Sequence, residues 1–377
     1  MSNTSKLGAL TLILFFISGS FIAAFNPVSA SDLVEDSWNT QTPMRQPRLA
    51  LGVAVVDGKI YAIGGYSENG WVGTNERYDP KTDEWVTRKS MPTPRADFAI
   101  AAYQGEIYCI GGTIPRDVCN VNEVYNPATN SWRTKSPMPF KAGNLRAHIV
   151  DGNFFVLCGP TLYMYDPITD VWTEKTSMPS TAATTLASAV ADNKIIVINT
   201  ISGSSLGLAE LKVLIYDPTT DLWSEKTGKS PENVFINAVG ATSGVYRPQR
   251  VYCFGQSYVP EELSITVVYN PAKDKWSTAE PLPVSRSQFG VAVVDDILYI
   301  IGGNTYDTRI VCLSANEQYV PIDYDNFYLL VIALLLTIGI VSSGLFFYFR
   351  KKKKTITSQS LLNKQVPTSD GLYVHIC

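Results

Sequence analysis

The stretch YDPKTDEW, residues 78–85, decides the fold because its pattern occurs five times along the chain. Each copy begins with a tyrosine, continues with Asp or Asn and a proline, and has a tryptophan seven residues after the tyrosine. The residues between are polar and form turns readily, so each copy predicts a strand, a tight turn and a second strand. The pairs are Tyr78 with Trp85, Tyr125 with Trp132, Tyr165 with Trp172, Tyr216 with Trp223, and Tyr269 with Trp276.

An apolar hairpin precedes each tyrosine and is clearest in residues 50–65, 99–112 and 290–303. In the first of these, ALGVAVVDGKIYAIGG, apolar residues alternate on both sides of the turn Asp57-Gly58. The hairpin and the tyrosine-tryptophan unit together predict four strands per repeat. A glycine doublet ends the second strand of three repeats, where a missing Cβ permits positive φ or a close backbone approach. The doublets are Gly64-Gly65, Gly111-Gly112 and Gly302-Gly303.

These three features, in this order, resemble the kelch repeat, the blade unit of kelch β-propellers. The resemblance covers about residues 38–321. It implies an all-β fold in which each repeat is one four-stranded blade. The three middle repeats replace the glycine doublet with Gly159-Pro160, Asn199-Thr200 and Gly255-Gln256, which leaves the shape of their connections open.

The two ends of the array complete each other. Trp38 has no tyrosine seven residues before it, whereas Tyr319, in ANEQYVP, has no tryptophan after it. We therefore expect the segment around Trp38 to be the fourth strand of a sixth blade, which closes the ring and covers its exposed edges. The predicted fold is an all-β, six-bladed propeller over residues 31–321. The repeat tryptophans, tyrosines and glycine doublets are expected to be packing residues of this scaffold.

Residues 1–30 are predicted to be a signal peptide. An apolar stretch follows Lys6, and the small residues Val28 and Ala30 suit a signal-peptidase site after Ala30. An uncleaved N-terminal anchor is the alternative, because the apolar and small residues from Leu7 to Phe25 nearly suffice to span a bilayer.

A single C-terminal transmembrane helix is predicted over residues 327–349, a stretch of 23 residues without a charge. Residues 322–326 would connect it to the propeller. The basic run from Arg350 to Lys354 follows at once, and cytoplasmic flanks carry an excess of Lys and Arg. We therefore expect a single-pass protein of the plasma membrane, with the propeller outside and residues 350–377 as a short basic cytoplasmic tail.

Composition excludes several functions. Of the 31 basic residues, seven lie in the two ends, which hold one of the 34 acidic residues, so the exported part is about nine charges negative. No nucleic-acid partner is expected, because such a partner requires a basic surface. The exported part has one histidine, His148, and lacks motifs such as Gly-x-Ser-x-Gly and His-Glu-x-x-His. We predict no catalytic residue, no metal and no cofactor.

Candidate ligand-binding residues come from the links between blades and from the loops after the second strands. Kelch propellers commonly bind partners at the face that these segments build, and the resemblance implies that arginines before the first strands rim a funnel there. These arginines are Arg48, Arg95, Arg146 and Arg286. A guanidinium at a fixed blade position can instead hydrogen-bond neighbouring carbonyls and hold adjacent blades together.

Seven further candidates lie on the loops. Trp71 is the one tryptophan outside the repeat period, and it either contacts a partner or folds back onto its own blade. The others are Arg116, Asp117, Tyr258, Glu261, Tyr306 and Asp307.

Three functions stay open at the level of sequence. The first is a non-catalytic cell-surface protein that binds an extracellular protein or glycan and is held by its transmembrane helix. The second is a carbohydrate-active enzyme: some kelch proteins are sugar mutarotases, and arginines with carboxylates in a funnel can bind an acidic sugar and move protons. The third is a subunit of an envelope complex, recruited through the helix or the tail.

Overall fold

The computed structural model describes residues 35–179, 186–203, 208–226, 234–257, 264–306 and 309–322, together with Leu345, Tyr348, Arg350 and two short strands near the C-terminus. Those strands, β29 (Val366–Pro367) and β30 (Tyr373–Val374), pair with each other. The chain divides into two compact units, residues 1–322 and 323–377. Among the described residues, no helix has the length and apolarity needed to cross a membrane. The predicted signal peptide lies outside the described residues, as does most of the predicted transmembrane segment, so both stay predictions.

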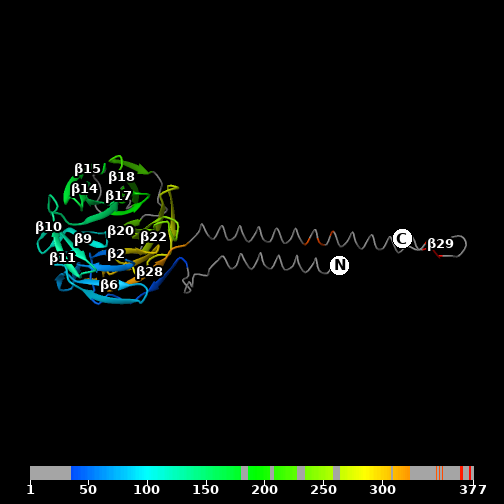
Figure 1. Cartoon of the computed structure of the whole chain (residues 1–377), viewed down its shortest axis with the longest axis horizontal. Coiled ribbons are helices and arrows are strands. Elements are labelled where there is room, and N and C mark those ends of the chain that lie inside the picture. The colour runs from blue at the N-terminus through cyan, green and yellow to red at the C-terminus, as the bar shows by residue number, and fades with distance from the viewer. Residues whose placement is uncertain are drawn as a thin grey trace. The chain divides into compact units, whose positions relative to one another are not determined.

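Six four-stranded sheets make up the first unit and surround a centre as blades (Figure 1). From the inner strand to the rim, blade one has β2 (Gly52–Val56), β3 (Lys59–Ile63), β6 (Asn75–Asp79) and β7 (Glu84–Arg88), and blade two has β8 (Ala99–Tyr103), β9 (Glu106–Ile114), β10 (Asp117–Asn126) and β11 (Ser131–Lys135). Blade three has β12 (Leu145–Val150), β13 (Asn153–Cys158), β14 (Thr161–Asp166) and β15 (Val171–Lys175), and blade four has β16 (Leu186–Ala191), β17 (Lys194–Gly203), β18 (Leu208–Asp217) and β19 (Leu222–Lys226). Blade five has β20 (Val234–Ala241), β21 (Val251–Ser257), β22 (Ser264–Asn270) and β23 (Lys275–Ala279), and blade six has β24 (Gly290–Val294), β25 (Ile297–Ile301), β28 (Asn316–Val320) and β1 (Ser37–Thr40).

The six inner strands contact one another in a closed circle, and β24 returns to β2. The circle closes through β1, which pairs antiparallel with β28 so that Trp38 lies opposite Tyr319. The same register places Trp85 opposite Tyr78 in blade one. The predicted six-bladed propeller, completed by its N-terminal strand, is therefore confirmed.

Apolar side chains fill the spaces between neighbouring blades. Between blades one and two, for example, Ala54 and Ile63 pack with Ile107 and Tyr125. Each sheet thus has an apolar face toward each neighbour, and a blade on its own cannot bury both faces. The stability of every blade therefore depends on the closed ring.

The repeated tyrosine and tryptophan fasten each blade to the link that arrives from the blade before it. In blade one, the ring centroids of Tyr78 and Trp85 lie 5.0 Å apart. The Tyr78 hydroxyl donates to Asp83 over 2.7 Å, and Asp83 also accepts the backbone N–H of Thr42 over 2.8 Å. The Trp85 indole N–H donates to the carbonyl of Thr42 over 2.8 Å. These residues are scaffold, as their spacing predicts.

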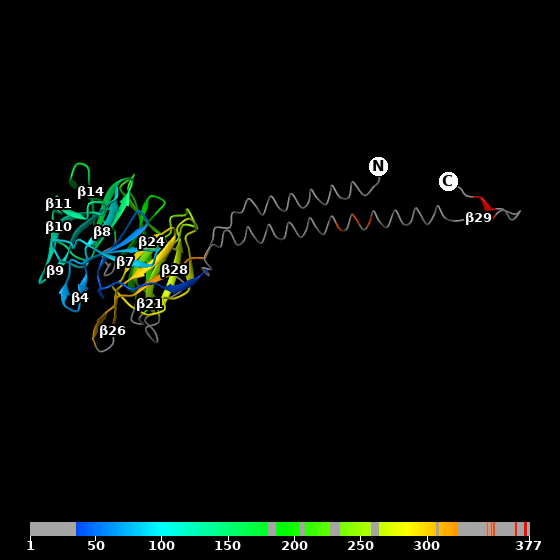
Figure 2. The same ribbon diagram turned by 60° about the horizontal axis from the view of Figure 1, so that its bottom comes forward.

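Alternating strand directions give the ring two faces. The link face carries the links between blades and the hairpins after the second strands. These hairpins include β4 (Tyr66–Ser67) with β5 (Gly70–Trp71), and β26 (Asn304–Tyr306) with β27 (Ile310–Cys312), which projects from the ring in Figure 2. The opposite face, here the turn face, carries tight turns such as those at Asp57-Gly58 and Asp79-Pro80.

Both described ends of the ring lie at the turn face. Ser37, where β1 begins, pairs with Val320, where β28 ends. Because β28 corresponds to β6, whose end leads into the turn at Asp79-Pro80, this end of the sheet belongs to the turn face. The link face is therefore the face opposite the chain ends.

Candidate functional site

Three of the four predicted arginines are enclosed within their blades and are at most 2% exposed. They form ion pairs between Arg48 and Glu76, Arg95 and Glu123, and Arg286 and Glu317. Arg48 Nη2 lies 2.7 Å from Glu76 Oε2, and its Nη1 donates to the carbonyl of Gly64 over 2.8 Å. Burial lowers the pKa of Arg48, an effect that Glu76 opposes. These contacts agree with a scaffold role, in which the guanidinium joins a link to its blade, rather than with a role in binding a ligand.

A dipeptide in the sequence marks the partners of these arginines. Asn-Glu stands just before the residue that precedes the repeat tyrosine, and it does so only in the three blades with a glycine doublet. The dipeptides are Asn75-Glu76, Asn122-Glu123 and Asn316-Glu317. Comparing the repeats with one another would therefore have found the ion pairs that the candidate arginines make.

Arg146 is not equivalent to the other three arginines, and its predicted place before the first strand is wrong. It lies within β12, opposite Leu157. Ala142 takes the linker position instead. Its carbonyl accepts the backbone N–H of Gly112, the second glycine of a doublet, just as the carbonyl of Arg95 accepts the N–H of Gly65. Blade three therefore has alanine where blades one, two and six have the buried linker arginine, and it has an arginine on its inner strand instead.

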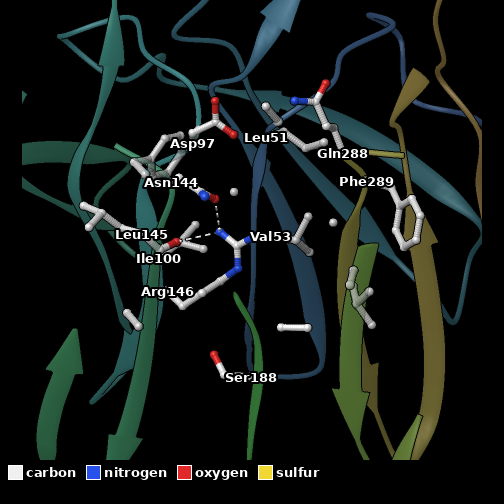
Figure 3. Close-up of a pocket in the computed structure, with 18 of the residues that line it drawn as sticks. Leu51, Val53, Asp97, Ile100, Asn144, Leu145, Arg146, Ser188, Gln288 and Phe289 are labelled. Carbon is white, nitrogen blue, oxygen red and sulfur yellow. Dashed lines mark hydrogen bonds between the residues drawn. The ribbon is translucent and has the colours of Figure 1, made fainter. Parts of the chain in front are cut away.

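The inner strands enclose a central cavity of about 540 Å³. Apolar and small residues are the most numerous of those that line it. The polar side chains that line it are Asp97, Asn144, Arg146, His148, Ser188, Asn237 and Gln288. In Figure 3, Arg146 lies between Asn144 and Ser188, while Asp97 and Gln288 are at the Asn144 end. Arg146 is the predicted candidate that lines this cavity, and the sequence reasoning missed Asp97, Asn144, Ser188, Asn237 and Gln288.

The mouth of the cavity opens on the link face and is framed by backbone. Ala50, Asp97, Asn144 and Gln288 occupy equivalent link positions, all with φ between 50° and 52°. The Ala50 N–H donates to the Gln288 carbonyl over 2.7 Å, and the Asp97 N–H donates to the Ala50 carbonyl over 3.0 Å. Asn and Asp tolerate this left-handed conformation better than most residues, which accounts for two of the four side chains.

Two positions of the inner strands hold glycine or alanine in five blades and a large side chain in blade three. The register places Arg146 where the other blades have Gly52, Ala99, Ala187, Ala238 and Gly290. His148, two residues later and on the same side of β12, stands where the others have Ala54, Ala101, Ala189, Gly240 and Ala292. The repeat pattern needs glycine or alanine at these positions for blade packing: a Cβ on Gly52 would lie 2.6 Å from Phe98. The two exceptions therefore do not belong to the repeated scaffold.

Arg146 has no carboxylate partner among the described residues. Its Nη1 donates to the Leu145 carbonyl over 2.9 Å and reaches Asn144 Oδ1 at 3.4 Å. Burial lowers its pKa, and the charge of Asp97 opposes that shift without an ion pair between them. Burial likewise raises the pKa of Asp97, opposed by Arg146 and by a hydrogen bond from Thr113. The cavity thus holds one cation and one separate carboxyl group.

His148 joins blades three and four. Its Nε2 lies 2.7 Å from the hydroxyl of Ser188 on β16. Burial and the nearby charge of Arg146 lower the pKa of His148 to about 4, so the imidazole is neutral at pH 7. This contact gives His148 a structural role between the two blades, and the side chain also forms part of the cavity wall.

Three predicted loop residues are placed on the link face. Trp71 is half-buried: it packs edge-on against Tyr66, with centroids 4.9 Å apart, and its indole N–H points at Thr113 of blade two. Arg116 and Asp117 are exposed at the tip between β9 and β10, and Asp117 Oδ2 lies 2.7 Å from Lys141 Nζ. None of these three residues lines the central cavity.

The remaining loop candidates are not placed. Tyr306 ends β26, and nothing is described of its side chain. Tyr258, Glu261 and Asp307 lie outside the described residues. Within the described ranges, no group of three His, Cys, Asp or Glu side chains is arranged to hold a metal ion.

Comparison with known proteins agrees with the fold. A family model for the kelch motif matches residues 47–92 and 94–139. Kelch-like protein 21 of Mus musculus is 30% identical over 120 residues, which are 32% of this chain and 18% of that protein. An F-box/kelch-repeat protein of Arabidopsis thaliana is 40% identical over 76 residues, 18% of this chain and 21% of that protein. The chain thus matches about a fifth of the length of these relatives.

A solved structure, titled "Structure of YjhT", has a TM-score of 0.60 and is 16% identical. It covers 74% of this chain, and 96% of its own chain is matched. The matched motifs in blades one and two, the similar relatives and the six closed blades agree with one another. This chain is a kelch-repeat β-propeller.

Proposed function

We propose that this protein is a non-catalytic binding module, held in the plasma membrane by residues 327–349, that presents its link face to an extracellular protein or glycan. One observation carries the proposal: both described ends of the ring lie at the turn face, where Ser37 pairs with Val320, so the link face and its hairpins are left clear of the chain ends. Kelch propellers commonly bind partners through this face, and its hairpins differ in length from blade to blade.

Exposed side chains allow the two faces to be tested against each other. Arg116 is exposed on the link face, and Trp71 keeps part of its surface there. On the turn face, Ile168 is 78% exposed, and Lys81 is exposed as well. Replacing either pair by alanine removes surface without touching the ion pairs that hold the blades together.

The experiment measures binding of the full chain, in detergent, to a glycan array and to a panel of purified extracellular proteins. The proposal expects at least one ligand, whose binding falls about tenfold or more with Trp71→Ala and Arg116→Ala together. The matched control, Lys81→Ala with Ile168→Ala, should bind as the wild type does. Loss of binding in the control, with normal binding in the link-face variant, would refute the link face as the binding face.

The anchor is tested separately, because the membrane segment lies mostly outside the described residues. Protease added to intact cells should remove the propeller and leave a fragment that contains the tail after Arg350. Release of the full chain into the medium, or protection of the propeller, would contradict the topology.

The second candidate is a carbohydrate-active enzyme that acts on acidic sugars. The observation that favours it is the cavity itself, in which Arg146, Asp97 and His148 place a cation and two titratable groups around one space. Acceleration of sugar-acid anomerisation by the wild type, and its loss in Asp97→Asn, would support this candidate over a binding module.

A further inference from the structure

A guanidinium deep in the ring lacks the counter-charge that its counterparts have. Arg48, Arg95 and Arg286 each pair with a glutamate, whereas Arg146 pairs with no carboxylate among the described residues. Taking a charge out of water is costly unless a partner and hydrogen bonds compensate for it. In blade three no carboxylate of the described residues forms an ion pair that would offset the cost of removing Arg146 from water.

The unused donors of Arg146 point to where a partner would lie. Its hydrogen bonds to Leu145 and Asn144 both use Nη1. Nε and Nη2 have no hydrogen-bond partner in the described structure and are not sealed from the cavity, since neither is among its buried, unpaired atoms. A guanidinium offers two parallel N–H groups that fit the two oxygens of a carboxylate.

The cavity has the size and the wall for a small molecule. Its volume of about 540 Å³ lies within the range of roughly 300–1,000 Å³ that is usual for ligand pockets. The inner strands of the other blades contribute apolar wall through Val53, Ile100, Val239 and Val291. Polar groups that can bind hydroxyls, among them Ser188 and Gln288, lie at other points of the wall.

We propose that the central cavity binds a small hydroxylated carboxylate, such as a sugar acid, whose carboxylate receives hydrogen bonds from Nε and Nη2 of Arg146. Asp97, at the mouth, accepts hydrogen bonds from hydroxyl groups of the ligand and disfavours a second negative charge there. The aliphatic ring face of such a ligand packs on the apolar wall. This site is separate from the link-face hairpins of the leading proposal. It is the cavity of the second candidate, and binding there requires neither catalytic turnover, nor the membrane anchor, nor a protein partner.

Glucuronate and glucose form a matched pair of probes, because glucose has a hydroxymethyl group in place of the carboxylate. Isothermal titration of the full chain at pH 7 should show glucuronate binding at least about tenfold more tightly than glucose, the size of one charge-assisted hydrogen-bond pair. Inorganic phosphate is the third probe. Phosphate binding as tight as that of glucuronate would indicate a general anion site and overturn the proposed ligand class.

Two variants remove the site in different ways. Arg146→Gln removes the cation, and glucuronate binding should fall to the level of glucose. Asn144→Asp keeps Arg146 but adds a carboxylate beside its Nη1, at a left-handed position that Asp tolerates, and this internal partner should weaken glucuronate binding about tenfold. If Arg146→Gln fails to fold, Asn144→Asp still decides the question.

The controls separate this proposal from the function of the link face. Arg133→Gln removes an exposed arginine on the outer strand β11, which pairs with Glu106, and should leave glucuronate binding unchanged. Trp71→Ala should also leave it unchanged. Wild-type protein that does not bind glucuronate at millimolar concentration, or Arg146→Gln and Asn144→Asp proteins that bind it normally, would overturn the proposal whatever the link face binds.

Discussion

The Tyr319 hydroxyl donates a hydrogen bond of 2.6 Å to Oδ1 of Asp36, a residue 283 positions earlier in the chain. In blade one the same bond joins Tyr78 to Asp83, five residues later. Asp36 also accepts the backbone N–H of Glu280 over 3.0 Å, as Asp83 accepts that of Thr42. The same pair of hydrogen bonds that the turn aspartate makes in blade one therefore also closes the ring. In blade six the aspartate comes from the N-terminal end of the propeller and the tyrosine from its C-terminal end.

Removing the Asp36 carboxylate should weaken the closure. Asp36→Ala leaves the Tyr319 hydroxyl and the Glu280 N–H without their acceptor, and we expect a loss of about 1–3 kcal/mol, seen as a melting temperature lower by several degrees. Glu84→Ala, an exposed change on the rim strand β7, should melt within about one degree of the wild type. Equal melting of both variants would show that Asp36 adds nothing to closure.

Removing the closing strand altogether should be far more damaging. Deletion of residues 31–45 takes away β1, including Trp38, whose ring lies 4.9 Å from Tyr319. It also exposes the edge of β28, which invites aggregation. We expect loss of the cooperative thermal transition in circular dichroism. A truncated protein that melts cooperatively near the wild-type temperature would contradict the role of β1.

The buried ion pairs should be needed as pairs. Glu76→Gln leaves the charge of Arg48 without its partner in a blade interior, and we expect a loss of about 3–5 kcal/mol in urea unfolding. Glu106→Gln breaks the half-exposed pair with Arg133 and should cost only about 0–1 kcal/mol. Similar losses in both variants would mean that burial of the pair does not set its contribution.

The scaffold could be predicted from the sequence because its residues repeat. Six blades, their strand order and the closure by Trp38 all follow from spacings that recur in every blade. The loop residues could not be predicted in the same way, because each occurs once. Trp71, for instance, packs on Tyr66 through a contact without a counterpart in the parts of the other loops that the structure describes.

The sequence around Arg146 resembles a link between blades, and this resemblance predicts a position before the strand that the structure does not show. GNLRAHIV has an arginine followed by an apolar strand, like the links of other blades, and the register was set by tertiary packing instead. Leu145 packs over Gly111, where an added Cβ would lie 2.5 Å from it, as Phe98 packs over Gly64 at 2.8 Å. That contact fixes Leu145 before the strand and places Arg146 inside it.

Comparing a glycine of a doublet with a glycine of a tight turn separates the cost of backbone strain from the cost of a steric clash. Gly64 has φ of 60°, and a Cβ there would lie 2.7 Å from the Arg95 carbonyl, whereas Gly58 has φ of 67° with open space around it. Gly58→Ala should cost about 1–2 kcal/mol through its backbone alone, and Gly64→Ala clearly more, because the backbone of the next link must also move. Urea unfolding measures both. Equal costs would show that the link moves aside freely.

The stability of the propeller should depend on pH through His148. Its pKa is about 6.5 in an unfolded chain and about 4 in the folded ring, where burial and Arg146 disfavour the charged form. Between these values the unfolded state binds the proton and the folded state does not, so stability falls as the pH drops from about 6.5 toward 4. His148→Gln can keep a hydrogen bond to Ser188 but does not titrate. Its urea midpoint should therefore decline less than that of the wild type between pH 7 and pH 5. Exposed carboxylates change little in this window, and Asp97, whose pKa is raised by burial, is present in both proteins. Parallel curves for the two proteins over this window would show that His148 is reached by water and titrates at its ordinary pKa, and the cavity would then be wetter at β12 than its contacts indicate.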